Sequence, residues 1–271
     1  MRKWLWVLSV VAIATVLPVP MARAVDSGRE ATLEAAYQRL TKAMDPDDMK
    51  KLYSLLDRMK TAGLVYDERL VVPERNVVAC KTPEQLHVLW GIMAMDATYA
   101  LLFEKSPERF VAEGKKLEER IAFPRDVLKQ ESVVMNRDEK VDKSVAFTLA
   151  MLKTAKTDPV VLNMFVGGFY GSTIELFHLF CSLGLATGVT KEYLELVNVH
   201  VPQLALAKEI LDAYSDNGEL TKLLDTDNRR RVMSSIIDSI GAKLGKLTEG
   251  DLGRILEIIG AVRDPLVAAC N

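Results

Sequence analysis

Residues 160–185 read VVLNMFVGGFYGSTIELFHLFCSLGL, and this stretch decides the fold. It is apolar on nearly all sides, and Asp158-Pro159 in front of it supplies an N-cap and a proline for the first helical turn. A helix without a polar face lies inside a protein rather than on its surface. We therefore predict a central helix over residues 160–185.

A second apolar stretch, residues 86–103, reads LHVLWGIMAMDATYALLF. The segment Thr82-Pro83-Glu84-Gln85 precedes it and is typical of a helix start, with Thr as N-cap, proline next and Gln three residues after the cap. We expect this stretch to form the second central helix.

Glycines inside the first apolar stretch need a physical reason, because each costs a helix ~1 kcal/mol relative to alanine. Gly167, Gly168 and Gly171 stand there, and Gly91 stands in the second stretch. The simplest reason is close approach of the two helices at these small residues. The alternative is a ligand that lies against bare backbone.

The rest of the chain predicts an all-α protein, because amphipathic stretches with helical spacing recur along it and strand patterns are scarce. No linker or abrupt change in composition divides it. We predict a single α-helical domain over residues 25–271, a bundle of about nine to ten helices, with residues 71–80 as its least regular part. Helical stretches, which number ten without the six-residue stretch 219–224, cover residues 30–44, 46–61, 83–105, 109–121, a stretch from 124, 138–156, 160–185, 190–214, 219–224, 228–246 and 248–262.

The N-terminus predicts export. Met1-Arg2-Lys3 is basic, residues 4–17 carry no charge, and Ala22-Arg23-Ala24 places small residues two apart, which together form the pattern of a signal peptide over residues 1–24. The alternative is a membrane anchor, but that needs ~20 apolar residues, and this run stops short. Val25 rather than a cysteine follows the cleavage site, so we expect no lipid anchor and a periplasmic or secreted location.

Charge and hydropathy restrict the partners. Removal of residues 1–24 takes away three basic residues and no acid, so the net charge falls from −2 to −5. Nucleic-acid binding needs a basic excess, so we expect no nucleic-acid partner. The apolar stretch 160–185 is interrupted by Asn163, Glu175 and His178, so we expect no stable membrane anchor after signal cleavage.

The three cysteines, Cys80, Cys181 and Cys270, allow at most one disulfide and match no zinc-site spacing. For each of them, a small buried apolar residue is the simpler interpretation. Their spacing does not indicate which two would pair.

Polar and aromatic side chains within the central helices are the candidate ligand-binding residues. Asp96 and Glu175 are set deepest among apolar neighbours, and a buried carboxylate must be paired or hydrogen-bonded. They belong either to a structural hydrogen-bond network or to a cavity between the two helices. No nucleophile with an adjacent base is visible, so we predict no catalytic residue. The predicted ligand-binding residues are Trp90, Asp96, Tyr99, Gly168, Tyr170 and Glu175.

Two Glu-x-x-His pairs suggest an alternative, a di-metal site. Glu84 with His87, and Glu175 with His178, would each share one helix face, as in four-helix bundles that hold two iron or manganese ions. Such a site needs two further inward carboxylates, for which Glu34 and Glu195 are the available acids. Otherwise these histidines pack or face solvent, and the sequence indicates no cofactor.

The basic run Arg229-Arg230-Arg231, beside Asp225 and Asp227, is typical of a solvated helix start.

Common catalytic motifs are missing from the sequence, which favours a binding protein over an enzyme. Those missing are Gly-rich phosphate loops, Gly-x-Ser-x-Gly elbows, Cys-x-x-Cys pairs and His-Glu-x-x-His motifs.

The segments LWGIMAMDATYA, residues 89–100, and FVGGFYGS, residues 165–172, resemble two stretches of an uncharacterised family of exported all-helical bacterial envelope proteins, many of them lipoproteins. The resemblance covers residues 30–215 and implies a helical bundle, with no functional residue to carry over. The chain differs from those lipoproteins in lacking a lipid-attachment cysteine. We expect a periplasmic protein that binds an envelope protein or a small apolar ligand.

Overall fold

The computed structural model describes residues 64–73, 77–121, 158–195, 226–241 and 246–270, with scattered positions in 31–61, 150–155 and 197–212 and at 243. All regular structure among these residues is helical, which confirms the all-α class. The predicted signal peptide and the predicted helix from residue 124 lie outside the described residues, as do most of the predicted helices 30–44, 46–61, 138–156 and 219–224.

Both apolar helices begin where local capping residues predict. Helix α3, Pro83–Leu102, starts after Thr82, whose side chain accepts from the Gln85 backbone while Gln85 returns the bond to the Thr82 N–H. Helix α6, Pro159–Thr187, starts after Asp158, whose Oδ1 accepts from Val160 N at 2.8 Å. Capping satisfies the backbone N–H groups that a helix start leaves without intrahelical partners.

The outer helices match their predicted positions with one consequential exception. Helix α4, Glu108–Arg120, buries only Phe110 and Leu117 and is the surface helix that its sequence predicts. Helix α9, Thr226–Gly241, begins slightly earlier and ends earlier than predicted. Helix α10, Glu249–Val267, begins as predicted but does not end at residue 262. It continues through Pro265, and the extension brings Arg263 into the helix and the core.

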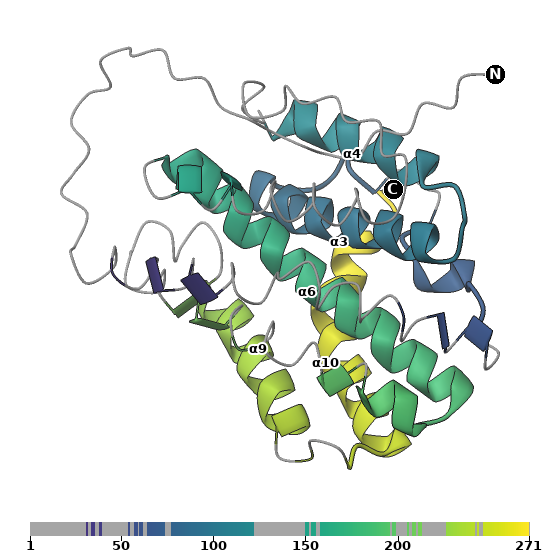
Figure 1. Cartoon of the computed structure of the whole chain (residues 1–271). Coiled ribbons are helices and arrows are strands. Elements are labelled where there is room, and N and C mark those ends of the chain that lie inside the picture. Colours follow the sequence, from purple (N-terminus) through teal and green to yellow (C-terminus); the bar gives the residue numbers. More distant parts are fainter. Residues whose placement is uncertain are drawn as a thin grey trace, which may run out of the picture.

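Helix α6 runs through the middle of the described part of the molecule, with α3 and α4 on one side of it and α9 on the other, while α10 crosses behind it (Figure 1). Its most extensive contacts are with α3, followed by those with α10. The stretch Val160–Thr187 is long and apolar enough to cross a membrane, yet 78% of its most apolar window is buried inside the protein, as expected for a core helix. The prediction of two central apolar helices is therefore confirmed.

The glycines of α3 and α6 let the two helices meet backbone to backbone. A Cβ on Gly91 would lie 2.0 Å from the Gly168 carbonyl oxygen, and a Cβ on Gly171 would lie 2.0 Å from the Val88 carbonyl oxygen. The Ser172 hydroxyl donates to the Gly91 carbonyl at 3.1 Å across the same contact. This confirms close helix approach as the reason for the glycines.

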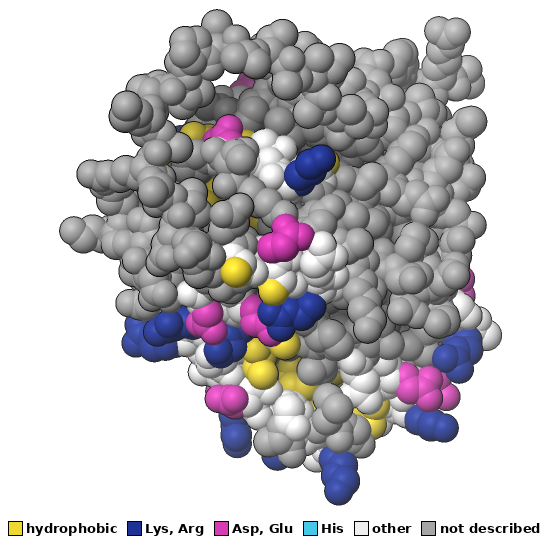
Figure 2. All heavy atoms as spheres, turned by 60° about the vertical axis from the view of Figure 1, so that its left-hand side comes forward, with side chains coloured by type: hydrophobic (Ala, Val, Ile, Leu, Met, Phe, Trp, Pro, Cys, Tyr) yellow, Lys and Arg dark blue, Asp and Glu magenta, His cyan; other side chains and the backbone are white. Residues whose placement is uncertain are grey.

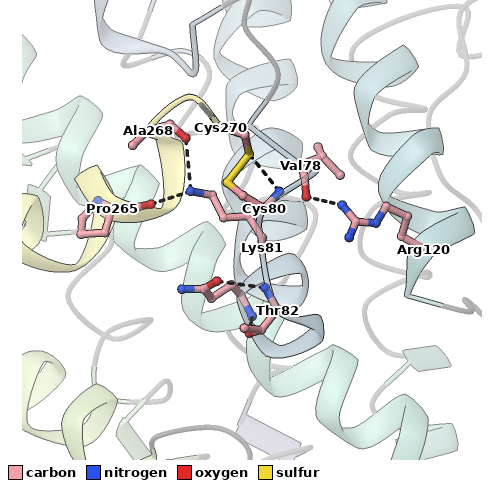
Figure 3. The surroundings of a disulfide bond; sticks show 9 residues. Val78, Cys80, Lys81, Thr82, Arg120, Pro265, Ala268 and Cys270 are labelled. Carbon is pink, nitrogen blue, oxygen red and sulfur yellow. Dashed lines mark hydrogen bonds between the residues drawn. A yellow bond between two sulfur atoms is a disulfide. The ribbon is translucent and has the colours of Figure 1, made fainter.

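A disulfide ties the start of α3 to the end of α10. Cys80, just before α3, is bonded to Cys270, just after α10, with their Cα atoms 5.5 Å apart (Figure 3). Beside it, Lys81 Nζ donates to the Pro265 carbonyl at 2.7 Å and to the Ala268 carbonyl at 3.2 Å (Figure 3). Lys81 thus satisfies carbonyls at the end of α10, a helix whose last turn has no basic residue of its own.

The prediction that each cysteine is a small buried apolar residue is therefore wrong for Cys80 and Cys270 and correct for Cys181. Cys181 is a buried free thiol on α6. Burial raises its pKa to about 12, so it stays protonated and unreactive at neutral pH.

Candidate functional site

Three charged side chains meet in the interior, one each from α3, α6 and α10. Asp96 and Glu175 are 0% exposed and Arg263 is 6% exposed. Arg263 Nε donates to Glu175 Oε2 at 2.5 Å, and Arg263 Nη2 donates to Glu175 Oε1 at 2.7 Å. Two parallel hydrogen bonds from one guanidinium make the strong, directional form of this ion pair. We call these three side chains, with the backbone groups of Leu70 and Val72 that they bind, the buried junction.

The buried junction also holds the irregular segment before α3. The Val72 N–H donates to Asp96 Oδ2 at 2.8 Å, and the Leu70 carbonyl accepts from Arg263 Nη2 at 2.8 Å. A hydrogen bond also links His178 of α6 to the Leu70 backbone. Buried backbone groups need partners, and here side chains supply them in place of a strand or helix ladder.

The charges in the junction do not balance if both acids are ionised. Two carboxylates then face one guanidinium, and Asp96 Oδ1 is buried without a hydrogen-bond donor. Burial, followed by the charge of Glu175, raises the pKa of Asp96 well above its ordinary value of 3.8. Asp96 can therefore keep a proton at a pH at which exposed aspartates have lost theirs.

Tyr99 lies beside the junction and joins α3 to the same irregular segment. Its hydroxyl accepts from the Asp67 N–H at 3.1 Å, and its ring stacks on Tyr66 with centroids 5.0 Å apart. Phe103 packs against it edge-on, also at 5.0 Å. Burial raises the pKa of Tyr99 to about 12, so the phenol is a hydrogen-bonding and packing group and not a base at neutral pH.

Trp90 and Gly168 contact each other where the ligand-binding cleft was predicted. A Cβ on Gly168 would lie 2.7 Å from the Trp90 ring, so the ring covers this glycine. The indole also forms a hydrogen bond with the carboxyl group of Glu118 on α4. Burial raises the pKa of Glu118 in spite of this hydrogen bond. Trp90 therefore joins α3 to α6 and α4, and at the Gly168 position the space between the helices is filled by protein.

Tyr170 and His87 lie around a buried arginine. The Arg229 guanidinium stands 5.4 Å from the Tyr170 ring centroid, and Arg229 is only 8% exposed. The prediction of a solvated basic run is thus wrong for Arg229, because α9 turns this side chain inward, whereas Arg231 is exposed. Burial, and then the charge of Arg229, lowers the pKa of His87 to about 4, so its imidazole is neutral at neutral pH.

The two Glu-x-x-His pairs are in separate places. His87 packs against Gly167, about 12 Å along the α6 axis from Glu175 at 1.5 Å per residue. The Glu175 carboxylate is paired with Arg263, and burial, the largest effect, lowers the pKa of His178.

The further acids that the di-metal alternative needs point outward. Glu34 accepts from Gln38 at 2.7 Å, and Glu195 lies 3.4 Å from Arg58, in both cases at exposed positions. Within the part of the chain that the structure describes, no group of three or more His, Cys, Asp or Glu side chains is placed to hold a metal ion. The di-metal alternative therefore stays a prediction without a supporting contact.

Of the six predicted ligand-binding residues, the structure brings Asp96 and Glu175 together in one network. It places Tyr99 beside them and Trp90, Gly168 and Tyr170 elsewhere along the α3–α6 contact. Sequence reasoning missed Arg263, because the predicted α10 ended one residue before it. Arg263 could have been sought from the two buried acids, because a buried carboxylate requires a cationic partner.

Comparison with models of known protein families finds no match, and searches of curated proteins and of solved structures likewise find no significant match. The resemblance to exported helical envelope proteins therefore rests on the two quoted segments alone.

Proposed function

We propose that this chain is an exported helical protein of the bacterial envelope that acts by binding a partner protein rather than by catalysis. One observation carries the proposal: each side chain predicted to line a ligand cleft is engaged within the chain. If these interior side chains all bind other groups of the same chain, the outer helices are the surfaces that can bind a partner protein. The pairs are Trp90 with Glu118, Asp96 with Val72, Tyr99 with Asp67, Tyr170 with Arg229 and Glu175 with Arg263.

Export is supported by two independent features. The first 24 residues have the signal-peptide pattern. The Cys80–Cys270 disulfide needs an oxidising compartment to form and persist, and such a compartment lies outside the cytosol. We propose a mature chain of residues 25–271 that folds as one bundle of about nine to ten helices.

The outer surface fits a protein partner better than a nucleic acid. Figure 2 shows basic and acidic side chains interspersed over the described part of one face, with small apolar areas between them. The described part of this face therefore presents no broad positive field to a phosphate backbone. Helix α4 is among the outer elements, since only Phe110 and Leu117 of its residues are buried.

Photo-crosslinking in living cells tests this proposal. Three variants each carry one photoreactive residue at an exposed helix position. The positions are Ala112 of α4, Ser235 of α9 and Ala261 of α10. We expect at least one position to crosslink to a different envelope protein. The matched control is the same variant without residues 1–24, which stays in the cytosol and should lose that crosslink. Absence of crosslinks from all three helices would contradict partner binding through these faces.

A small apolar ligand is the competing function, and Trp90 reports on it. Trp90 is the only tryptophan of the mature chain and is 7% exposed against α6. A ligand between α3 and α6 would change its emission and raise the melting temperature. We expect neither change with a library of apolar compounds, and a saturable change in both would favour the ligand. Elemental analysis of the exported protein tests the di-metal alternative directly.

A further inference from the structure

If Asp96 and Glu175 were both ionised, the buried junction would contain a negative charge that no partner neutralises. A buried charge that is left without a partner strongly destabilises a folded protein. Arg263 is bonded through two nitrogens to Glu175, and this pair is neutral in sum. Asp96 is the surplus acid, at 0% exposure.

The hydrogen bonds of Asp96 point to where a proton would sit. Its Oδ2 accepts from the Val72 N–H, whereas its Oδ1 has no donor. That side chain is nevertheless in hydrogen-bonding contact with the Glu175 carboxylate, an acceptor. Two carboxyl groups can bond each other only if one of them carries a proton.

Asp251 of α10 is an internal comparison, because it is another buried aspartate, at 6% exposure. Its Oδ1 accepts from Lys243 Nζ at 2.5 Å, and its Oδ2 accepts from the Thr248 N–H at 2.9 Å. The hydrogen bond from Lys243 is the main reason that its pKa falls to about 2. An aspartate whose two oxygens both have donors is thus ionised, and Asp96 lacks one of those donors.

We propose that Asp96 carries a proton at neutral pH and donates it from Oδ1 to Glu175, so that the buried junction is a proton-controlled latch that holds the segment 64–73 and α10 on the α3–α6 pair. Loss of the proton to solvent leaves one net negative charge in the junction. The segment then opens so that water can reach the carboxylate.

The direction of the pH dependence follows from the raised pKa of Asp96. The closed state binds one more proton than the open state at any pH between the ordinary value of 3.8 and the raised value. Latch stability is therefore greatest below the ordinary value and is lost as the pH rises through the raised one. The titratable and charged groups that face the junction from the packed elements are Tyr66, Asp67, Glu68, Tyr99, Arg109, Glu175, His178, Arg263 and Asp264.

His178 has the opposite effect, and the experiment must separate the two. Its pKa is lowered from the ordinary 6.5, so the open state binds a proton on this imidazole more readily than the closed state does. Above pH 6.5 the imidazole is at most half protonated even in the open state, so it changes the opening constant by about twofold at most, and the Asp96 dependence dominates.

Infrared spectroscopy of the folded protein tests the protonation state. We expect a carboxylic-acid C=O band at about pH 7 that shifts when aspartate alone is labelled with 13C, and that disappears in Asp96→Asn but persists in Asp251→Asn. The isotope shift needs no variant, so the test holds even if Asp96→Asn fails to fold. Absence of a protonated aspartate band in the labelled wild-type protein would overturn the proposal.

Hydrogen exchange tests the latch. The Val72 amide donates to Asp96, so its protection reports opening of the segment. Between pH 6.5 and the raised pKa of Asp96 we expect the opening equilibrium constant in the wild-type protein to rise about tenfold per pH unit, after correction for intrinsic exchange. In Asp96→Asn, whose amide keeps both the acceptor and the donor, the constant should not change with pH. The same slope in Asp96→Asn, or a flat wild-type profile, would overturn the latch.

Discussion

Removal of the Cys80–Cys270 bridge should be the most informative perturbation of stability. The two cysteines are separated by 190 residues, so the bridge closes most of the chain into one loop. Cross-linking a loop of this length removes about 18 cal/mol/K from the entropy of the unfolded chain, or about 5 kcal/mol at 25 °C. Residual structure in the reduced unfolded chain lowers the effect, so we expect Cys80→Ser/Cys270→Ser to lose ~3–5 kcal/mol of unfolding free energy.

Urea unfolding, followed by circular dichroism, measures this loss. The wild-type protein in reductant should unfold at the same midpoint as the double serine variant, whereas reductant should not change the variant itself. The m-value of the wild-type protein in reductant, and that of the double serine variant, should exceed the m-value of the oxidised wild-type protein, because unfolded chains without the bridge are more extended. Cys181→Ala is the control for loss of a thiol, and it should keep its sensitivity to reductant because Cys181 is outside the bridge. Equal midpoints for oxidised and reduced wild-type protein would refute the reasoning.

Three further predictions concern the core. Gly91→Ala places a Cβ 2.0 Å from a carbonyl oxygen and should lower the free energy of unfolding by ~1–3 kcal/mol or more. The control Gly114→Ala places a Cβ with nothing within 4 Å of it and should raise the free energy of unfolding by ~0.4–1 kcal/mol. Melting temperatures measure both effects, and equal shifts in the two variants would contradict the close contact between α3 and α6. Arg263→Met should cost ~3–5 kcal/mol because it leaves Glu175 buried and unpaired, and Arg263→Met/Glu175→Leu should recover part of that loss in urea unfolding. The pKa of His87 is lowered to about 4 from an ordinary 6.5, so the stabilisation that its neutral form gives the folded protein is complete above pH 6.5 and is lost as the pH falls toward 4. His87→Gln should therefore flatten the plot of melting temperature against pH over this range. An unchanged plot would exclude His87 as the source of the pH dependence.

The helix starts could be predicted because their causes are local. Thr82 and Gln85 cap α3 within four residues of sequence, and Asp158 caps α6 in the same way. The central position of both helices could also be predicted, since a helix without a polar face has nowhere stable to lie except the interior. The end of α10 could not, because Pro265 interrupts the local pattern and the groups that contact the last turn, Lys81 and Cys80, come from a distant part of the sequence.

The candidate site was predictable only in part. The sequence by itself determined that Asp96 and Glu175 stand among apolar neighbours and that the chain is helical, and it favoured close helix approach over a ligand as the reason for the glycines. Only the tertiary structure decided that Arg263 pairs with Glu175 across 88 residues, and that Cys80 rather than Cys181 bonds Cys270. Burial follows from the pattern of neighbours along the chain, which the sequence displays. Which residue becomes the partner of a buried acid depends on which parts of distant helices meet in space, and that depends on how all the helices pack together.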